Sequence, residues 1–202
     1  MASSGDLARY RDKRDLERTP EPAGDRPSDD ADGPRFVIQQ HDASTMHWDF
    51  RLEADGVLKS WSVPKGPSTD PGDKRLAVPT EDHPLDYADF EGVIPEGEYG
   101  AGSVIVWDAG SYRNLTTDDD GDEISVADAV DDGHLRVWLN GQKLSGGYAL
   151  TKMGGDRSEW LLIKMDDSEA DRRRRPAKTQ PESVMTDCTV EDVAEQERAE
   201  ES

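Results

Sequence analysis

The sequence contains few of the residues that mark secreted or membrane proteins. It has one cysteine in 202 residues, Cys188, so no disulfide can form within the chain. No stretch approaches the ~20 apolar residues of a membrane span, and the N-terminus lacks the apolar segment of a secretory signal. These absences predict a cytoplasmic protein in a reducing environment, with no membrane partner.

Basic residues are scarce as well. The chain has 24 Lys and Arg against 45 Asp and Glu, which gives a net charge of −21. This balance argues against a nucleic-acid partner, because phosphate binding depends on Lys and Arg. Two explanations would still allow such a partner: basic residues could gather at one site, or the whole surface could be adapted to high salt, as in halophilic proteins. Because the acidic excess extends through residues 35–165, we adopt the halophilic origin as a hypothesis.

Apolar residues are too few to form a core along the whole chain. They make up 33% of it and are concentrated in residues 35–165. The length fits a single domain with tails. We therefore expect an N-terminal arm at residues 1–33, one domain at 34–166 and a flexible, charged C-terminal tail at 167–202. The arginine run at 172–175 could be a nucleic-acid tether or simply part of this tail.

Short strand-like runs dominate the central domain, and no long helix is predicted there. Turn pairs such as Asp55-Gly56, Ala109-Gly110 and Asn140-Gly141 separate several of them. The fold expected is all-β: a small closed β-barrel of about eight strands, because closure removes exposed edges, preceded by a short helical arm at 7–18. A sandwich is the alternative. The runs are 36–40, 46–53, 57–63, 75–79, 103–107, 111–115, 134–139, 142–152 and 158–165.

Two stretches of the domain do not read as strands. Residues 82–102 are rich in Gly, Pro and acid, and long ordered loops of this kind are usually functional. Residues 118–132 carry many acidic residues and no basic one, which predicts a solvated loop with one helical turn at 125–130. A calcium site is the alternative there, although the EF-hand spacing is absent. Residues 189–199 could form a short amphipathic helix.

The run from Met46 to Leu52 carries the most chemistry. Its apolar and polar residues alternate, so His47, Asp49 and Arg51 share one face of the predicted strand. His41, in the preceding run, is close enough to join them across a short connection. Two imidazoles and a carboxylate can bind a divalent transition metal with open positions left over. The guanidinium of Arg51 suits a phosphate oxygen, so the set indicates phosphoester chemistry.

Two other interpretations of this face remain open. It could be a polar strand face with unrelated histidines. It could also belong to another β-barrel metalloenzyme, such as a cupin-like oxygenase, although Arg51 favours a phosphate over a small organic substrate.

Longer stretches resemble the 3′-phosphoesterase domain that forms the N-terminal module of bacterial DNA ligase D and also occurs alone. The resemblance covers residues 10–165 and implies a small β-barrel with its site in a crescent-shaped groove. The matching stretches are 10–15, 19–22, 36–53, 58–61, 63–67, 81–87, 90–102 and 160–164.

The resemblance also implies an activity and its residues. Members of this family use manganese to remove a 3′-terminal ribonucleoside, and then the remaining 3′-phosphate, from DNA or RNA/DNA ends in DNA repair by non-homologous end joining. The metal ligands would be His41, His47 and Asp49. The phosphate would meet Arg51, His83 and Tyr87, with His83 titrating near neutral pH. Catalysis would be assisted by Arg14, Asp15 and Glu21 of an arm folded over the groove, and the polar positions of the groove would be Gln40, Lys65, Arg75 and Glu81.

Some positions depart from the family's pattern. Leu16 stands where an aromatic residue is usual, and Gly147-Tyr148 and Thr151-Lys152 replace expected Trp and Arg positions. None of them is an expected metal ligand. End joining would require a separate DNA ligase and polymerase as partners. The alternative function is a non-catalytic module that binds DNA ends and recruits a ligase.

Overall fold

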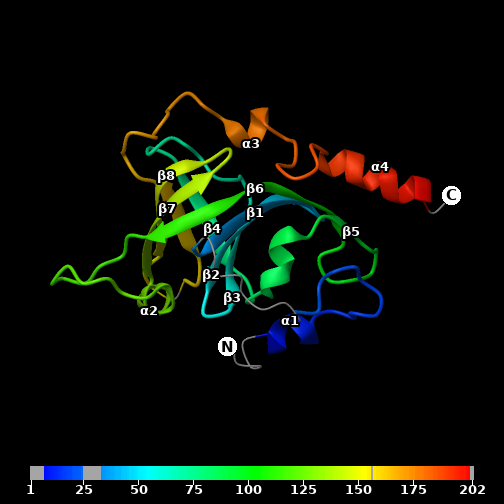
Figure 1. The fold of residues 1–202 in the computed structure, drawn as a ribbon, viewed down its shortest axis with the longest axis horizontal. Helices are drawn as coiled ribbons and strands as arrows, with labels where there is room; N and C mark the ends of the chain where they lie inside the picture. The colour runs from blue at the N-terminus through cyan, green and yellow to red at the C-terminus, as the bar shows by residue number, and fades with distance from the viewer. Residues whose placement is uncertain (1–6, 25–32, 156, 201–202) are drawn as a thin grey trace.

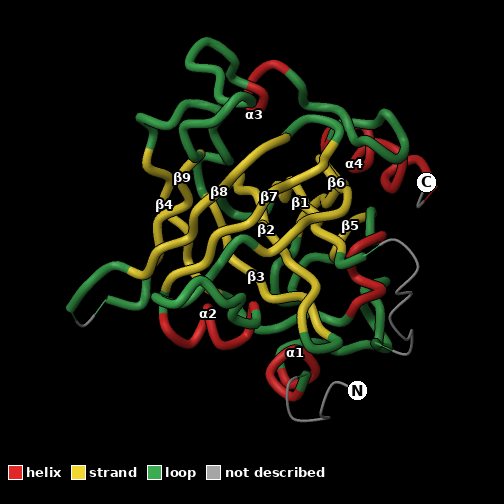
Figure 2. Tube along the Cα trace, turned by 60° about the vertical axis from the view of Figure 1, so that its left-hand side comes forward, coloured by secondary structure: helices red, strands yellow, loops and turns green. Residues whose placement is uncertain are grey.

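Eight antiparallel strands close into a β-barrel in the computed structural model, which describes residues 7–24, 33–155 and 157–200 (Figures 1 and 2). The barrel order is β1-β2-β3-β4-β9-β8-β7-β6, and β6 pairs with β1 to close it. β5 adds to the edge of β6 outside the barrel. The predicted all-β barrel is therefore confirmed. The strands are β1 (Arg35–Asp42), β2 (Met46–Ala54), β3 (Val57–Val63), β4 (Lys74–Pro79), β5 (Gly92–Ile94), β6 (Gly102–Asn114), β7 (His134–Gly141), β8 (Ser145–Lys152) and β9 (Trp160–Lys164).

Short turns set the register of the barrel. Asp55 and Gly56, with φ of 52° and 75°, join β2 to β3 and leave Ala54 opposite Val57. Two consecutive positive φ angles match the right-handed twist of a hairpin, which explains the Asp-Gly pair. A hairpin also joins β7 to β8, but the predicted turn pair Asn140-Gly141 lies at the end of β7. Gly141 N donates to Leu144 O, so the turn is formed by Gln142 and Lys143.

The prediction of a turn at Ala109-Gly110 is wrong. β6 runs through this pair without a break, with β1 on one side and β7 on the other. A Cβ at Gly110 would lie 2.0 Å from the carbonyl oxygen of Asn140, so this glycine permits a close approach of two strands. The two runs at 103–107 and 111–115 are therefore one strand, and the short β5 was hidden in the Gly- and Pro-rich stretch at 82–102.

Two apolar clusters lie on opposite sides of the strands. The first fills the barrel and takes residues from all eight barrel strands, among them Phe50, Trp61 and Tyr148. The second lies on the outer face of β1 and β6, where Val37, Val104 and Val106 pack against Tyr10 and Tyr87. It attaches the N-terminal arm, which contains α1 (Ala8–Asp12), and the 3-10 helix η2 (Leu85–Asp89) to the barrel. The outer face of β1 is thus covered, and the site lies beside this cover.

The acidic stretch forms a loop followed by α2 (Val126–Asp132), close to the predicted turn of helix. Ser125 caps α2 by accepting a hydrogen bond from the backbone N–H of Asp128. Gly133 ends it with φ of 83°, a left-handed conformation that glycine adopts without strain.

The C-terminal segment, expected as a flexible tail, follows the barrel surface and contains α3 (Pro176–Thr179) and α4 (Val190–Glu200) (Figure 1). The Arg172 guanidinium lies 3.1 Å from Asp70. The backbone N–H of Val184 donates to Val106 O at 2.9 Å, and Val190 is buried. The bond from Val184 has a physical cause. Between the parts paired with β5 and β7, β6 has an open edge, and Val184 supplies a hydrogen-bond donor to one of its backbone carbonyls.

Within the described residues, none of the helices combines the length and apolar character needed to cross a membrane.

Candidate active site

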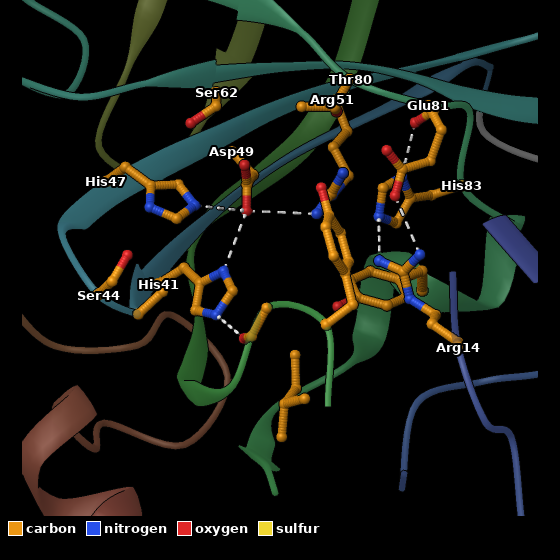
Figure 3. Close-up of a pocket in the computed structure, with 15 residues that line it drawn as sticks. Arg14, His41, Ser44, His47, Asp49, Arg51, Ser62, Thr80, Glu81 and His83 are labelled. Atoms are coloured by element: carbon orange, nitrogen blue, oxygen red, sulfur yellow. Dashed lines mark hydrogen bonds and ion pairs between the residues drawn. The ribbon is translucent and has the colours of Figure 1, made fainter. Parts of the chain in front are cut away.

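A cavity of about 400 Å³ opens on the outer face of β1 and β2 (Figure 3). Side chains alternate along β2, so Trp48 and Phe50 fill the barrel while Asp49 and Arg51 face outward into the cavity. Most of the sequence-predicted site residues line this cavity: Arg14, His41, His47, Asp49, Arg51, Glu81, His83 and Tyr87.

The predicted metal ligands lie together. His41 and His47 are directly opposite each other in the β1–β2 register. His41 Nδ1 lies 3.6 Å and His47 Nε2 3.4 Å from the same oxygen of Asp49, Oδ2. One ligand atom from each of the three residues lies within 4.8 Å of the others. This is the geometry of a group that can hold one metal ion from one side.

Backbone carbonyls fix the tautomers of both histidines. His41 Nε2 lies 2.7 Å from Gly100 O, and His47 Nδ1 lies 2.9 Å from Thr45 O. A carbonyl only accepts, so these two nitrogens carry the protons. The other ring nitrogens then direct their lone pairs at the Asp49 carboxylate. When both imidazoles are neutral, three acceptors therefore converge, which fits a divalent cation.

Charge around Asp49 supports the same conclusion. Burial by itself raises the pKa of Asp49, but the Arg51 guanidinium and the two imidazoles outweigh it and hold that pKa well below its usual range. Burial lowers the pKa of His47, but its hydrogen bond to Asp49 and that carboxylate's charge leave it raised. The raised pKa favours a proton between His47 Nε2 and Asp49 at pH values where a free imidazole would be neutral, so a metal ion competes with that proton.

Arg51 is a buried cation beside this group. Its Nη2 lies 3.4 Å from Asp49 Oδ2, and its Nε donates to Gln39 Oε1 at 2.8 Å. Gln39 is held in turn by the carbonyls of Tyr87 and Phe90. Within the part of the chain that the structure describes, Arg51 Nη1 is buried without a hydrogen-bond partner. A guanidinium fixed in this way has a donor left for an anion.

His83 lies on the other side of Arg51. Its Nδ1 donates to Glu81 O at 2.8 Å, so Nε2 carries the lone pair and accepts from Arg14 Nη2 at 3.2 Å (Figure 3). Burial, and then the charges of Arg51 and Arg14, hold the pKa of His83 well below its usual range. The imidazole is therefore neutral at pH 7, which differs from the titration near neutrality that the sequence suggested.

Two carboxylates hold Arg14 in place. Its Nε donates to Glu21 at 2.8 Å and its Nη1 to Glu81 at 3.0 Å. Glu21 also accepts from the hydroxyl of Tyr87 at 2.9 Å. Tyr10 anchors this part of the arm, because its side chain is fully buried and its ring lies 4.1 Å from the Arg14 guanidinium. The arm thus supplies one wall of the cavity through Arg14.

Five predicted residues do not line the cavity. One is Glu21, which reaches it only through Arg14 and Tyr87; the other four lie farther away. Asp15 is exposed and accepts from the backbone N–H of Glu17. Gln40 alternates with His41 along β1, so it turns to the inner face of the strand. Lys65 and Arg75 line a separate small crevice together with Arg175.

Other lining residues had no individual signal in the sequence. They come from the β1–β2 connection, from β3, from the segment after β4, from β5 and from the loop between β5 and β6. The last two belong to the stretch at 82–102 that was expected only as a functional loop. They are Ala43, Ser44, Ser62, Thr80, Ile94, Tyr99 and Gly100.

Comparisons with known proteins agree with this geometry. A family model described as "DNA Ligase D 3'-phosphoesterase domain" matches residues 39–152. The multifunctional non-homologous end joining protein LigD of Pseudomonas aeruginosa is 51% identical over 94% of the chain. The multifunctional non-homologous end joining DNA repair protein LigD of Mycobacterium tuberculosis is 48% identical over 79% of the chain. The chain spans only about a fifth of these relatives, 22% and 20% of their lengths.

Proposed function

The chain belongs to the DNA Ligase D 3'-phosphoesterase domain family, and we propose that it heals 3′ ends of DNA or RNA/DNA primers. In this proposal it removes a 3′-terminal ribonucleoside as a phosphodiesterase and then the 3′-phosphate as a phosphomonoesterase. The observation that carries the proposal is the convergence of His41, His47 and Asp49 beside the buried guanidinium of Arg51.

His41, His47 and Asp49 would hold a divalent transition metal, Mn²⁺ in our proposal. Imidazole and carboxylate ligands suit such ions, and their three lone pairs already converge. When bound, the ion supplies Lewis-acid polarisation of a phosphoryl oxygen.

Arg51 and His83 would act on the phosphate itself. The charge that develops on phosphoryl oxygens is best stabilised by donors fixed in advance, and Arg51 is fixed by Gln39 and Asp49. His83 is neutral before substrate binds. The negative charge of a bound phosphodiester or phosphomonoester beside it raises its pKa, so His83 would become a proton donor only once substrate is present.

Tyr87 and the arm would support these groups. Tyr87 lies under Arg51, with 4.9 Å between the guanidinium and the ring centroid, and it donates to Glu21. Arg14 would bind the phosphate from the side opposite the metal, while Glu21 and Glu81 position it. The remaining predicted residues lie outside the cavity and would act indirectly. Asp15 would support the arm and Gln40 the β1 strand. Lys65 and Arg75 would act from the separate crevice.

The proposed setting is repair of broken DNA in the cytoplasm. The relatives are named as non-homologous end joining proteins. By analogy the present chain would clean 3′ ends for a separate DNA ligase and polymerase.

One assay tests the proposal against the alternative of a non-catalytic end-binding module. A DNA primer ending in a single ribonucleotide is incubated with the protein and Mn²⁺, and in parallel with EDTA. We expect release of the nucleoside and then of phosphate with Mn²⁺ alone. Binding of the primer without any product would favour the end-binding module, and turnover in EDTA would refute the metal.

A further inference from the structure

Tyr99 is an exposed aromatic residue in the wall of the cavity, with no role in the chemistry above. Its exposed fraction is 49%. Only two other large apolar side chains of the described residues, Leu76 and Met185, are exposed to a similar degree, and neither lines the cavity. Tyrosine is enriched at binding surfaces, because its ring is apolar while its hydroxyl remains hydrated.

The local backbone places this ring. Pro95 O accepts from Glu98 N and Glu98 O accepts from Ala101 N, so two turns follow each other between β5 and β6. In the second turn Tyr99 precedes Gly100, whose φ of +76° suits the third position of a type II turn. The same turn directs Gly100 O to His41 Nε2. Tyr99 is thus tied through one residue to a metal-site histidine.

The arm closes the cavity on the side of Tyr99. Lys13 Nζ lies 4.7 Å from the ring centroid and 3.4 Å from the hydroxyl. The Arg14 guanidinium is 5.5 Å from the same centroid, and Arg18 bridges to Glu98 at 3.3 Å. A polynucleotide that extended past Tyr99 would have to break the contacts of Lys13 and Arg18 with the loop. A single terminal nucleoside would need only the space beside the Tyr99 ring.

We propose that Tyr99 stacks on the base of the terminal nucleoside, the unit that leaves in the diesterase step. The proposal rests on the proposed function and adds its substrate contact. Stacking on an aromatic ring accepts every base, because each base has a π face. That property suits an enzyme that trims ends of any sequence.

The test compares two primers, one ending in a ribonucleotide and one in a 3′-phosphate, which lacks the departing base. For Tyr99→Ala we expect the ratio of kcat/KM on the first primer to that on the second to fall about tenfold, mainly through KM. Tyr99→Phe keeps the ring and should keep the ratio. Leu76→Ala is the matched control, because it removes an equally exposed apolar side chain away from the cavity.

A primer whose terminal ribose carries no base provides a second, independent arm. The unmodified protein should lose about the same factor on this primer, and Tyr99→Ala should add no further loss, as expected for two changes to one contact. The stacking role alone would be overturned if Tyr99→Ala left the ratio of kcat/KM unchanged, for example by lowering both values equally. It would also be overturned if Tyr99→Ala caused a further loss of kcat/KM on the abasic primer. Failure of the unmodified protein to act on either primer would overturn the proposed function and this role with it.

Discussion

Arg14 Nη2 donates a hydrogen bond to His83 Nε2 at 3.2 Å, across 69 positions of sequence. The contact joins the N-terminal arm to the phosphate side of the cavity. It also fixes the protonation of the imidazole, since a guanidinium only donates and therefore requires a lone pair on Nε2. The arm thus controls the charge of a catalytic candidate without being part of the barrel.

The first prediction concerns the pKa of His83. It is held low by burial and then by Arg51 and Arg14, so Arg14→Gln should raise it. The protein loses stability as pH falls from the unfolded pKa of about 6.5 towards the low folded value, because His83 must become charged in a buried position. This loss should be smaller in Arg14→Gln. NMR titration of the ring and unfolding at pH 5 and 7 measure both effects.

Lys13→Gln is the matched control for this prediction. It removes a cation that contacts Glu81 but does not contact His83, so the ring should titrate as in the parent protein. A pKa of His83 that stays low in Arg14→Gln would show that burial alone sets it.

The second prediction concerns the phosphate contacts. Arg51→Ala and His83→Ala should each reduce the diesterase and monoesterase rates by about 10²-fold or more, because both reactions pass through the same charged phosphoryl group. Single-turnover rates on both primers measure this. Arg113→Ala, an exposed arginine that lies over Trp138, is the control and should leave both rates unchanged. If Arg51→Ala spared either reaction, the shared phosphate site would be excluded.

The third prediction concerns the metal. His47→Ala and Asp49→Asn should weaken Mn²⁺ binding by more than about 100-fold, since loss of a hydrogen bond to a ligand alone costs 10–100-fold. His134→Ala, an exposed histidine bonded to Thr151, should bind normally. Calorimetry measures both. In the parent protein the metal displaces a proton from His47, whose pKa is raised, so affinity should rise with pH through that pKa. Affinity independent of pH would contradict this competition.

The fourth prediction concerns the arm. Deleting residues 1–22 should leave a folded barrel that still binds metal, because the interior cluster contains none of the arm's described residues, 7–24. The deletion exposes the outer cluster where Tyr10 was buried, so the melting temperature should fall. Both phosphoesterase rates should drop. The two factors should be unequal, because one substrate carries a nucleoside on its phosphate and the other does not. Rates equal to those of the full chain would remove the arm from catalysis.

The fifth prediction concerns salt. With a net charge of −21, self-repulsion destabilises the folded state at low ionic strength. If the surface is adapted to high salt, stability and activity should both increase towards 1 M KCl, where the Debye length falls to about 3 Å. Thermal unfolding from 0.05 to 3 M KCl tests this. Maximal stability in dilute buffer would argue against a halophilic origin.

The proximity of His41, His47 and Asp49 could be predicted from the sequence because it depends on local structure. Alternation along β2 and a short connection to β1 are enough to bring His41, His47 and Asp49 together. The continuous β6 was missed because Gly110 resembles a turn residue, whereas its role depends on Asn140, a strand away. Periodicity cannot indicate a contact of this kind.

Positions that depend on distant parts of the chain were the least predictable. The arm and the C-terminal segment have the composition of disordered tails, yet Tyr10 and Val184 pack against the outer cluster. Only the resemblance placed the arm over the site. Tyr99 could be placed only in a long Gly- and Pro-rich loop, because an exposed ring follows no pattern of burial.

The β1–β2 hairpin has a kinetic consequence. His41, His47 and Asp49 lie within one hairpin, whereas barrel closure requires β1 to meet β6, far along the chain. Strands that are close in sequence pair early. Distant strands pair late, because their pairing requires a long loop to close. A chain that has not yet closed its barrel would already present these three ligand residues on neighbouring strands. Metal capture could thus precede the arrival of Arg14 and His83, so an ion in the medium would act on the refolding rate as well as on the finished site.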